Sequence, residues 1–217
     1  NYILMEMGQP LHAFDADLLE DQKLRVRYAR AEEKLLALDG REYVLTPECL
    51  VIADGRRPVA LAGVIGGQET AVSEKTKRVF LESAVFAPAV VRRTSRRFRL
   101  RTESSYRFER GVDPEAAALA GPRAADWIVK TAGGKSTSPV DHYPAPSRPA
   151  PIEVSWERVK ALIETPVSQD RAEERMRRLS EQIEKTPGGW RLTPPSWRPD
   201  LAHVQDVAEE VARLDGY

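Results

Sequence analysis

A segment rich in proline and serine constrains the fold of this chain more than any other feature. Residues 136–151 read STSPVDHYPAPSRPAP and hold few apolar side chains to bury. Such a composition is typical of a linker and favours extended polyproline geometry. We therefore place a domain boundary near Arg148, with one domain over residues 1–148 and a smaller one over 149–217. A length of 217 residues agrees with this division, at roughly 150 residues per domain.

The sequence before the linker predicts strands joined by short turns. Apolar runs predict strands over residues 24–28, 36–38, 42–45, 49–53, 59–65 and 79–81, and a short helix over 88–93. Asp39-Gly40 is a hairpin signal between two of these strands. Asp113 is expected to cap a helix that runs to Thr131. Gly121-Pro122 lies inside that helix, and we expect a kink or break there.

The sequence after the linker predicts a small module of mixed structure. Helices are expected over residues 155–163, 170–184 and 200–214, and a strand over 190–192 after a turn at Gly188-Gly189. Ser155 and Ser168 are the expected caps of the first two helices. The whole chain is therefore predicted to be α+β, with a larger β-rich domain followed by a small α+β module.

Composition excludes several classes of protein. Lys plus Arg and Asp plus Glu both number 33, which argues against a dedicated basic nucleic-acid module. Cys49 is the only cysteine, so neither an intrachain disulfide nor a cysteine-cluster zinc site can form. No apolar run approaches the ~20 residues of a membrane span, and the first residues lack the pattern of a signal peptide. We expect a cytoplasmic protein without membrane association, cut from a longer chain because it lacks an initiator methionine.

Charge is nevertheless segregated within the chain. Residues 92–110 read RRTSRRFRLRTESSYRFER and contain eight arginines against two glutamates, with three aromatic residues between them. Arginine matches phosphate geometry and aromatic rings can stack on bases, which favours contact with a polyanion such as an RNA backbone. The alternative is a solvated surface whose arginine stems cover apolar groups. Composition alone does not decide between the two.

Three places in the sequence are candidates for a binding site. His12 follows a proline turn and could position a water or a phosphate, although a lone histidine is more often structural. Gly66-Gly67 lets backbone amides approach a ligand closely, but no nucleotide-loop pattern accompanies it. Glu82 follows an apolar strand, where it is either a charge that reaches solvent or a buried acceptor for a polar ligand group. No serine–histidine–aspartate or cysteine–histidine set is indicated, so covalent catalysis is not expected.

Carboxylates gather on the last predicted helix. Asp206, Glu209 and Glu210 stand at positions i, i+3 and i+4, and Asp200 lies near the first turn. The simpler interpretation is a favourable interaction of acids with the helix dipole and cap. The alternative is a site for magnesium, which prefers oxygen ligands.

Five motifs in a fixed order resemble a known family. They are GQPLHAFDADLL, GVIGGQETAV, VFLESAVFAP, RTESSYRFERGVDP and PSWRPDLAHVQDVAEEVARLDGY. Together they resemble the bacterial phenylalanine–tRNA ligase beta subunits, in the B3/B4 editing domain followed by the small B5 domain. The resemblance covers nearly the whole chain.

This resemblance implies a function for the first domain. It would hydrolyse the ester of tRNA-Phe wrongly charged with tyrosine, within an enzyme that ligates phenylalanine to tRNA-Phe using ATP. A hydrophobic pocket rejects an added hydroxyl by only about 100-fold, or about 2.7 kcal/mol, so a second pocket is needed. The implied partners are tRNA-Phe and an alpha subunit, in a heterotetramer of two alpha and two beta subunits. The aminoacylation site would lie on the alpha subunit and not on this chain.

The resemblance also implies roles for five residues. Glu82 matches the position that accepts the phenolic proton of tyrosine, and phenylalanine would leave that carboxylate unpaired. Gly66, Thr102 and Ser104 match positions that line the pocket, where Gly66 leaves room for the ring and the hydroxyls contact the amino acid or the attacking water. His12 matches a histidine near the ester. We thus expect His12, Thr102 and Glu82 to be catalytic, with Gly66, Glu82, Thr102 and Ser104 binding substrate, although alanine is common in the family where Ser104 stands.

In the small domain, the resemblance implies a metal. Asp200, Asp206, Glu209 and Glu210 match positions assigned to a magnesium ion shared with the alpha subunit, so the ion is expected to depend on that partner. Editing itself would need no cofactor. Two other functions stay open, namely a non-catalytic RNA-binding module and an architectural module that supports the alpha subunit.

Overall fold

The computed structural model describes residues 1–146, 148–163 and 166–216. The chain divides into two compact units, Asn1–His142 and Tyr143–Tyr217, each with its own hydrophobic core. The division falls inside the proline-rich segment, six residues before the boundary that composition suggested. Helices and antiparallel strands occur in both units, which confirms the α+β prediction. Within the described residues, no helix is both long and apolar enough to cross a membrane.

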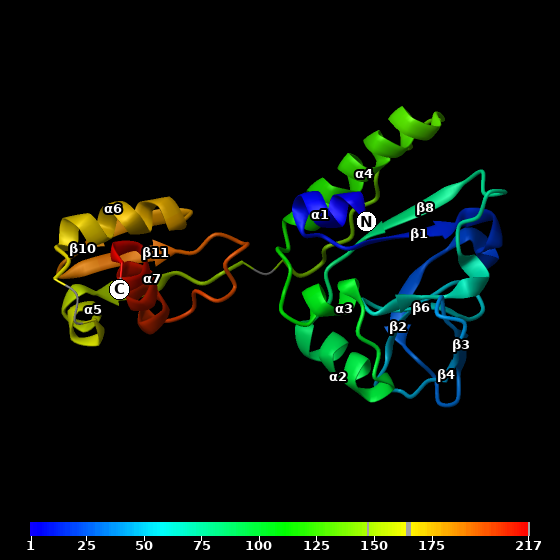
Figure 1. Cartoon of the computed structure of the whole chain (residues 1–217), viewed down its shortest axis with the longest axis horizontal. Helices are drawn as coiled ribbons and strands as arrows, with labels where there is room; N and C mark the ends of the chain where they lie inside the picture. Colours follow the sequence, from blue (N-terminus) through cyan, green and yellow to red (C-terminus); the bar gives the residue numbers. More distant parts are fainter. Residues whose placement is uncertain (147, 164–165, 217) are drawn as a thin grey trace. The chain divides into compact units, whose positions relative to one another are not determined.

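The larger unit is built from short strands with helices packed on them (Figure 1). Its strands are β1 (Leu11–Asp15), β2 (Arg25–Tyr28), β3 (Lys34–Leu36), β4 (Glu42–Val44), β5 (Leu50–Ala53), β6 (Pro58–Leu61), β7 (Ile65–Gly66) and β8 (Val79–Ser83). Its helices are α1 (Tyr2–Met7), α2 (Pro88–Phe98), α3 (Glu103–Phe108) and α4 (Ala116–Ala132). Short 3₁₀ turns are η1 (Ala16–Leu18), η2 (Glu20–Gln22) and η3 (Gln68–Thr70).

An antiparallel sheet in the order β2-β5-β6-β7 forms the centre of this unit. The apolar runs that predicted β5 and β6 are almost entirely buried. Such continuous runs are expected where both faces of a strand are covered. Val51 and Val91, fully buried on β5 and α2, belong to the same core. The hairpin of β3 and β4 turns at Asp39-Gly40 as predicted, with Gly40 at φ +78°.

A second, two-stranded ribbon pairs β1 with β8, two segments far apart in the sequence. Side chains alternate between the two faces of each strand. One face carries Leu11 and Leu81, which pack with Ile3 of α1 and with Ala120 and Ala124 of α4. The opposite face carries His12, opposite Glu82 in the register. The ribbon therefore has one face covered by helices and an opposite face that carries His12 and Glu82 together with Phe14 and Phe80; we call the second one the polar face for its histidine and glutamate.

Helix α3 begins at a capping box. The Thr102 hydroxyl accepts a hydrogen bond from the Ser105 amide at 3.0 Å, and the Ser105 hydroxyl accepts one from the Thr102 amide at 3.0 Å. These bonds satisfy amides that would be unpaired at the helix start. Phe108, near the other end of α3, packs edge-on against Phe86 with ring centroids 5.1 Å apart. The short helix is thus fixed at both ends.

The structure corrects three predictions in the larger unit. Residues 59–65 are not one strand, because the chain turns between β6 and β7 with Gly63 at φ +69°. Helix α4 begins at Ala116, since the Asp113 carboxylate accepts from the Glu115 amide at 2.9 Å and closes a turn before it. The helix also continues through Pro122 without a break. Pro122 removes one backbone hydrogen bond, but Ala120 and Ala124 on either side of it pack in a small core with Leu11 and Leu81.

The smaller unit packs helices against a sheet in the order β10-β11-β9. Its elements are β9 (Ile152–Ser155), α5 (Trp156–Leu162), α6 (Gln169–Leu179), β10 (Gln182–Thr186), β11 (Gly189–Thr193) and α7 (Val204–Asp215). Trp190 is fully buried at the centre of the core, where its indole donates to the Glu173 carboxylate at 3.2 Å. Ser155 and Ser168 cap α5 and α6, which confirms those two predictions.

Two helices of the smaller unit differ from prediction. Helix α6 ends at Leu179 and not at residue 184, because residues 182–186 pair with β11 as a strand. Helix α7 begins at Val204 and not at Asp200. The Asp206 carboxylate accepts from the His203 amide at 2.7 Å, which sets the helix start there. The predicted turn at Gly188-Gly189 and the strand after it are confirmed.

Candidate active site

The larger unit contains a cavity of about 90 Å³ beside the polar face of the β1–β8 ribbon. The turn between β6 and β7 and one side of α3 complete its wall. Apolar side chains, including those of Leu61, Ile65 and Phe108, form much of the lining. Four residues that the sequence singled out also line it, namely His12, Gly66, Glu82 and Ser104. The fold thus brings together residues from four separate motifs.

His12 and Glu82 are the polar pair of this cavity. They are direct partners in the β1–β8 register, and the His12 ring lies edge-on to Phe14 with centroids 4.4 Å apart. His12 Nε2 and Glu82 Oε2 are both buried, and neither has a hydrogen-bond partner among the described residues. A buried polar atom without a partner costs about 1–3 kcal/mol. Two such atoms beside one cavity are what a site for a polar ligand requires.

Burial shifts both titrations toward neutral forms. It raises the pKa of Glu82 to about 7 and lowers the pKa of His12 below its usual value, because each charged form loses contact with water. The imidazole is therefore neutral at pH 7 and can accept a proton. The Glu82 carboxyl exchanges its proton near neutral pH, so it can accept a hydrogen bond from a hydroxyl group of a ligand. Perturbed groups of this kind in a cleft mark candidate functional sites.

Gly66 provides space for the His12 ring. A Cβ atom at Gly66 would lie 2.2 Å from His12 Cε1 and 2.7 Å from His12 Nε2, closer than any packed contact. We predicted that this glycine leaves room for a substrate ring. In the structure, the space beside its Cα is filled by the catalytic candidate His12 itself. The absence of a side chain at Gly66 therefore allows the imidazole to occupy this position.

Thr102 and Ser104 hold the turn between β6 and β7. The Thr102 hydroxyl donates to the Val64 carbonyl at 2.7 Å while it accepts from the Ser105 amide. The Ser104 hydroxyl donates to the Gly63 carbonyl at 3.2 Å. Thr102 is absent from the cavity lining, whereas Ser104 is part of it. The Thr102 hydroxyl thus both donates and accepts within the protein, and of the two residues only Ser104 lines the cavity.

Gly63 is a further residue of the cavity wall, and no prediction from the sequence named it. Its backbone lies at φ +69°, and a Cβ there would come within 2.9 Å of the Phe86 ring. Its carbonyl is the acceptor for Ser104. An isolated glycine inside an apolar run, as in VALAGVIGG, is a signal for such a break in a strand. Phe108 carried no comparable signal, because its place on the cavity wall depends on the packing of α3.

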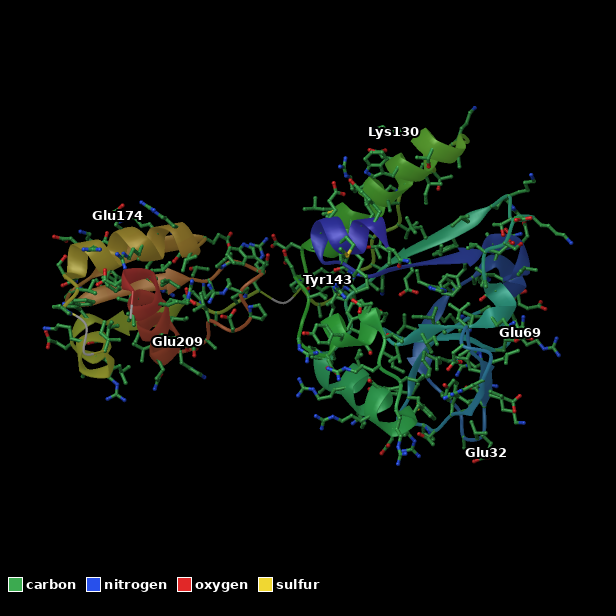
Figure 2. The ribbon with its side chains drawn as sticks, in the orientation of Figure 1. Glu32, Glu69, Lys130, Tyr143, Glu174 and Glu209 are labelled. Atoms are coloured by element: carbon green, nitrogen blue, oxygen red, sulfur yellow. The ribbon has the colours of Figure 1, made fainter. Side chains whose placement is uncertain are left out.

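The four carboxylates of the smaller unit do not converge on a common point. Arg198 binds the Asp200 carboxylate through two bonds of 2.8 and 2.6 Å and Glu210 at 3.0 Å. Arg213 also binds Glu210, and Asp206 accepts from backbone amides at the start of α7. Glu209 lies exposed on the same helix (Figure 2).

Electrostatics in this cluster are already balanced by arginine. The Arg198 guanidinium holds the pKa of Asp200 below its usual value, and Arg213 followed by Arg198 does the same for Glu210. Among the described residues, no group of three or more metal-ligating side chains is placed to hold an ion. The residues as arranged therefore do not fit a magnesium ion, because a guanidinium occupies the charge-balancing position.

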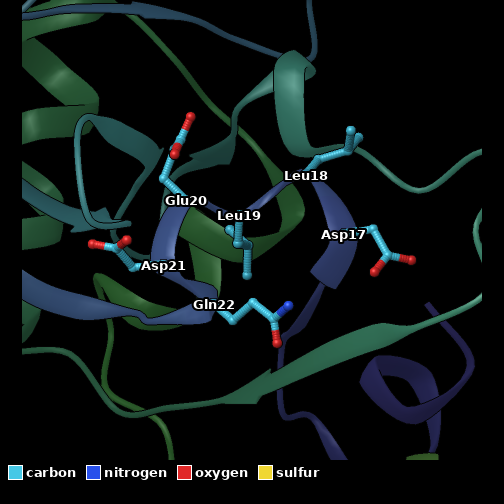
Figure 3. A pocket seen from close by; sticks show the side chains of 6 residues that line it. All are labelled: Asp17, Leu18, Leu19, Glu20, Asp21 and Gln22. Carbon is cyan, nitrogen blue, oxygen red and sulfur yellow. The ribbon is translucent and has the colours of Figure 1, made fainter.

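A second hollow opens in the larger unit along residues 17–22 (Figure 3). Asp17, Glu20 and Asp21 line it, but Figure 3 shows their carboxylates pointing in different directions. The arrangement offers no set of groups that converge on one ligand. The cavity with His12 and Glu82 is therefore the better candidate site.

Two known domain families match this chain. Residues 1–133 match the B3/4 domain, and residues 152–217 match the tRNA synthetase B5 domain. The chain belongs to the B3/4 domain family. The B3/4 match covers the whole ribbon and cavity, and the B5 match covers β9 to α7. We refer to the two units below as the B3/4 unit and the B5 unit.

Curated relatives confirm the resemblance stated from the motifs. The phenylalanine–tRNA ligase beta subunit of Moorella thermoacetica is 47% identical over 218 residues, which cover 100% of this chain and 27% of that protein. The beta subunit of Nitratidesulfovibrio vulgaris is 44% identical over the same shares. The chain thus spans about a quarter of the length of the curated relatives it matches. Among solved structures, an N-terminal fragment of the phenylalanyl-tRNA synthetase beta subunit of Pyrococcus horikoshii covers 95% of this chain and 60% of that one, with 16% identity and a TM-score of 0.49.

Proposed function

We propose that the B3/4 unit is an aminoacyl ester hydrolase that releases tyrosine from mischarged tRNA-Phe. One observation carries the proposal. His12 and Glu82 face each other across two strands, beside one small cavity, and each has a buried polar atom without a partner. The first can accept a proton from water, and the second can accept a hydrogen bond from a hydroxyl group.

Glu82 is the proposed selector for tyrosine. A tyrosyl hydroxyl would donate to Glu82 Oε2 and satisfy the unpaired acceptor. Phenylalanine would pack against the apolar wall near Phe108 equally well, but it would leave the Glu82 carboxyl unpaired. Sites built to hydrogen-bond a hydroxyl discriminate strongly against the analogue that lacks it. The cavity therefore supports a preference for the wrong amino acid, as an editing site requires.

His12 is the proposed acceptor of the water proton. The water oxygen bonds to the ester carbonyl carbon while one of its protons moves to His12 Nε2. The bond from that carbon to the ribose oxygen then breaks, and the proton passes from the imidazole to the leaving oxygen. The products are free tyrosine and tRNA with a free terminal ribose. No covalent intermediate and no metal is needed for these steps.

The two hydroxyl residues divide their roles in this proposal. Ser104 is proposed to contact the amino-acid end of the substrate, since this residue lines the cavity. Thr102 is a positioning residue that fixes α3 and the turn at Val64. This positioning role takes the place of the catalytic role that we expected for Thr102 from the sequence.

Deacylation of Tyr-tRNA-Phe by the full chain tests the proposal. Release of tyrosine is expected, and His12→Ala is expected to slow it by on the order of 100-fold, the usual scale of general-base catalysis. His142→Ala is the matched control, because that histidine is exposed and outside both cores. Equal rates for the two variants would contradict a role for His12, and no release by the chain itself would contradict the hydrolase.

The wider protein is proposed to be a phenylalanine–tRNA ligase that uses ATP in the cytoplasm. The names of the curated relatives support this, and they imply an alpha subunit and tRNA-Phe as partners. We expect the heterotetramer of two alpha and two beta subunits. An architectural role of the B5 unit toward the alpha subunit is compatible with hydrolysis in the B3/4 unit. Binding of tRNA without any release of tyrosine would favour the non-catalytic alternative.

A further inference from the structure

We propose that the exposed arginines of α2 and of the residues just after α2 and α3, together with Tyr106 of α3, form an RNA-binding face that holds the acceptor end of the tRNA beside the cavity. This rests on the proposed function only in its last step, the delivery of the ester to the cavity. The RNA contact itself stands on the charge and geometry of α2 and α3. We name the surface the arginine face and define it by Arg92, Arg93, Arg96, Arg97, Arg99, Arg101, Tyr106 and Arg110.

Helical spacing gathers four of these arginines on one side of α2. Arg92 and Arg96 are one turn apart, as are Arg93 and Arg97, and all four are exposed. The opposite side of α2 carries Val91, which is fully buried in the core. The helix therefore presents its cations to solvent and not to the protein interior. Figure 2 shows nitrogen-tipped side chains around α2.

Several arginines of the arginine face, although not Arg110, have no ion-pair partner in the part of the chain that the structure describes. Among the described residues, no carboxylate lies within ion-pair distance of Arg93, Arg96 or Arg99. Arg97 has only the exposed Glu48 at 3.3 Å. Pairing therefore does not explain why so many arginines are placed here in a chain of zero net charge. Arginine forks that remain free are suited to phosphate oxygens.

Tyr106 adds an aromatic group to the arginine face. The residue is 43% exposed, with the Arg110 guanidinium 3.8 Å from its ring centroid and the Arg101 guanidinium 5.9 Å away. Cations with an exposed ring favour a nucleic acid over an acidic protein surface, because bases stack on aromatic rings while phosphates bind arginine. The observation is independent of the charge count.

Helix α3 connects the arginine face to the candidate active site. Ser104 and Phe108 of α3 line the cavity, while Tyr106 on the same helix is exposed. An RNA backbone on the face would therefore pass next to the cavity. A single-stranded terminus, whose bases are free to stack, suits this path.

Binding of labelled, uncharged tRNA-Phe across a salt series tests the proposal with the full chain. Arg93→Gln/Arg96→Gln is expected to weaken binding about 10-fold at low salt and to reduce the slope of log K against log salt by about 1.5, for two lost phosphate contacts. Arg158→Gln/Arg178→Gln removes two exposed helical arginines from the B5 unit and is expected to change neither quantity. Unchanged binding by the first pair, or the same loss in both pairs, would overturn the proposal.

Two further measurements distinguish RNA binding by the arginine face from binding of an acidic protein and from the proposed hydrolysis. Polyglutamate of matched charge should displace the tRNA poorly, and equal displacement would assign the face to an acidic protein and overturn the RNA contact. Hydrolysis of tyrosine ethyl ester, which has no RNA, should be the same in the wild-type chain and in Arg93→Gln/Arg96→Gln. A wild-type chain that binds tRNA through these arginines but hydrolyses no ester would refute the proposed function and leave the RNA contact standing.

Discussion

At the scale of single residues, the account depends on two groups whose proton affinities are set by burial. Glu82 and His12 lie on partner strands, yet the dominant influence on each is the loss of water and not the neighbouring charge. A buried carboxyl is tolerated here because it can hold its proton up to about pH 7. Its Oε2 atom is buried and has no hydrogen-bond partner in the part of the chain that the structure describes, so it is available to a hydroxyl group.

A stability measurement follows from the raised pKa of Glu82. The native chain retains the proton up to about pH 7 and the unfolded chain only up to about 4.5, so stability falls as pH rises through this interval. Glu82→Gln cannot ionise and should remove that loss, raising stability at pH 8 by at most about 3 kcal/mol relative to the wild type. Urea unfolding at pH 5 and pH 8 measures this. Identical pH dependence in both chains would mean that Glu82 is not buried as described.

Gly66 provides a second prediction at this scale. Gly66→Ala should displace the His12 ring and slow tyrosine release by on the order of 10–100-fold, since a shift of about 1 Å can have such an effect. In a His12→Ala background, the same substitution should have little further effect. Single-turnover deacylation of the single and double variants tests the coupling. Additive losses would show that Gly66 acts on something other than His12.

At the scale of elements, the sequence predicted the caps and turns that depend on hydrogen bonds between nearby residues. The caps Ser155 and Ser168 and the turn at Asp39-Gly40 were readable because their bonds close within a few residues. The pairing of β1 with β8 was not readable, because it joins segments distant in the sequence. The end of α6 at Leu179 depended on a strand partner in β11 and was missed for the same reason.

The hydrogen bonds of Thr102 at the start of α3 are predicted to stabilise the fold. Thr102→Val keeps the shape but loses both the bond to Val64 and the cap to Ser105, and it should lower the free energy of unfolding by about 1–2 kcal/mol. Thr102→Ser retains both bonds and should stay within about 0.5 kcal/mol of wild type. Chemical denaturation measures both variants. A Val variant of wild-type stability that hydrolyses no ester would restore Thr102 to a catalytic role.

At the scale of the whole molecule, the candidate site was predicted by motif and not by pattern. The motifs pointed to His12, Gly66, Glu82, Thr102 and Ser104, and the fold brings all of them except Thr102 to the lining of one cavity. Neither composition nor periodicity indicated that they would meet, because each lies on a different element. The carboxylates of the B5 unit are the opposite example. They are close in sequence but do not meet at one site, because Arg198 and Arg213 bind Asp200 and Glu210.

That dispersal leads to a prediction about magnesium. Millimolar magnesium should leave the melting temperature of the full chain unchanged, because arginine already balances Asp200 and Glu210. Arg198→Ala should lower the stability of the B5 unit, with Arg158→Ala as a control of equal charge. Calorimetry with and without magnesium measures both effects. A rise in melting temperature that a chelator reverses would show that an ion site forms in this chain after all.

The central claim is that the cavity selects tyrosine through the Glu82 carboxyl. The most direct test compares kcat/KM for deacylation of Tyr-tRNA-Phe and Phe-tRNA-Phe by the wild-type chain, by Glu82→Leu and by Glu74→Leu, an exposed glutamate of the same unit. The wild type and Glu74→Leu should prefer the tyrosyl ester by at least about 100-fold, and Glu82→Leu should lose or invert that preference. A preference for tyrosine that survives in Glu82→Leu would contradict the account.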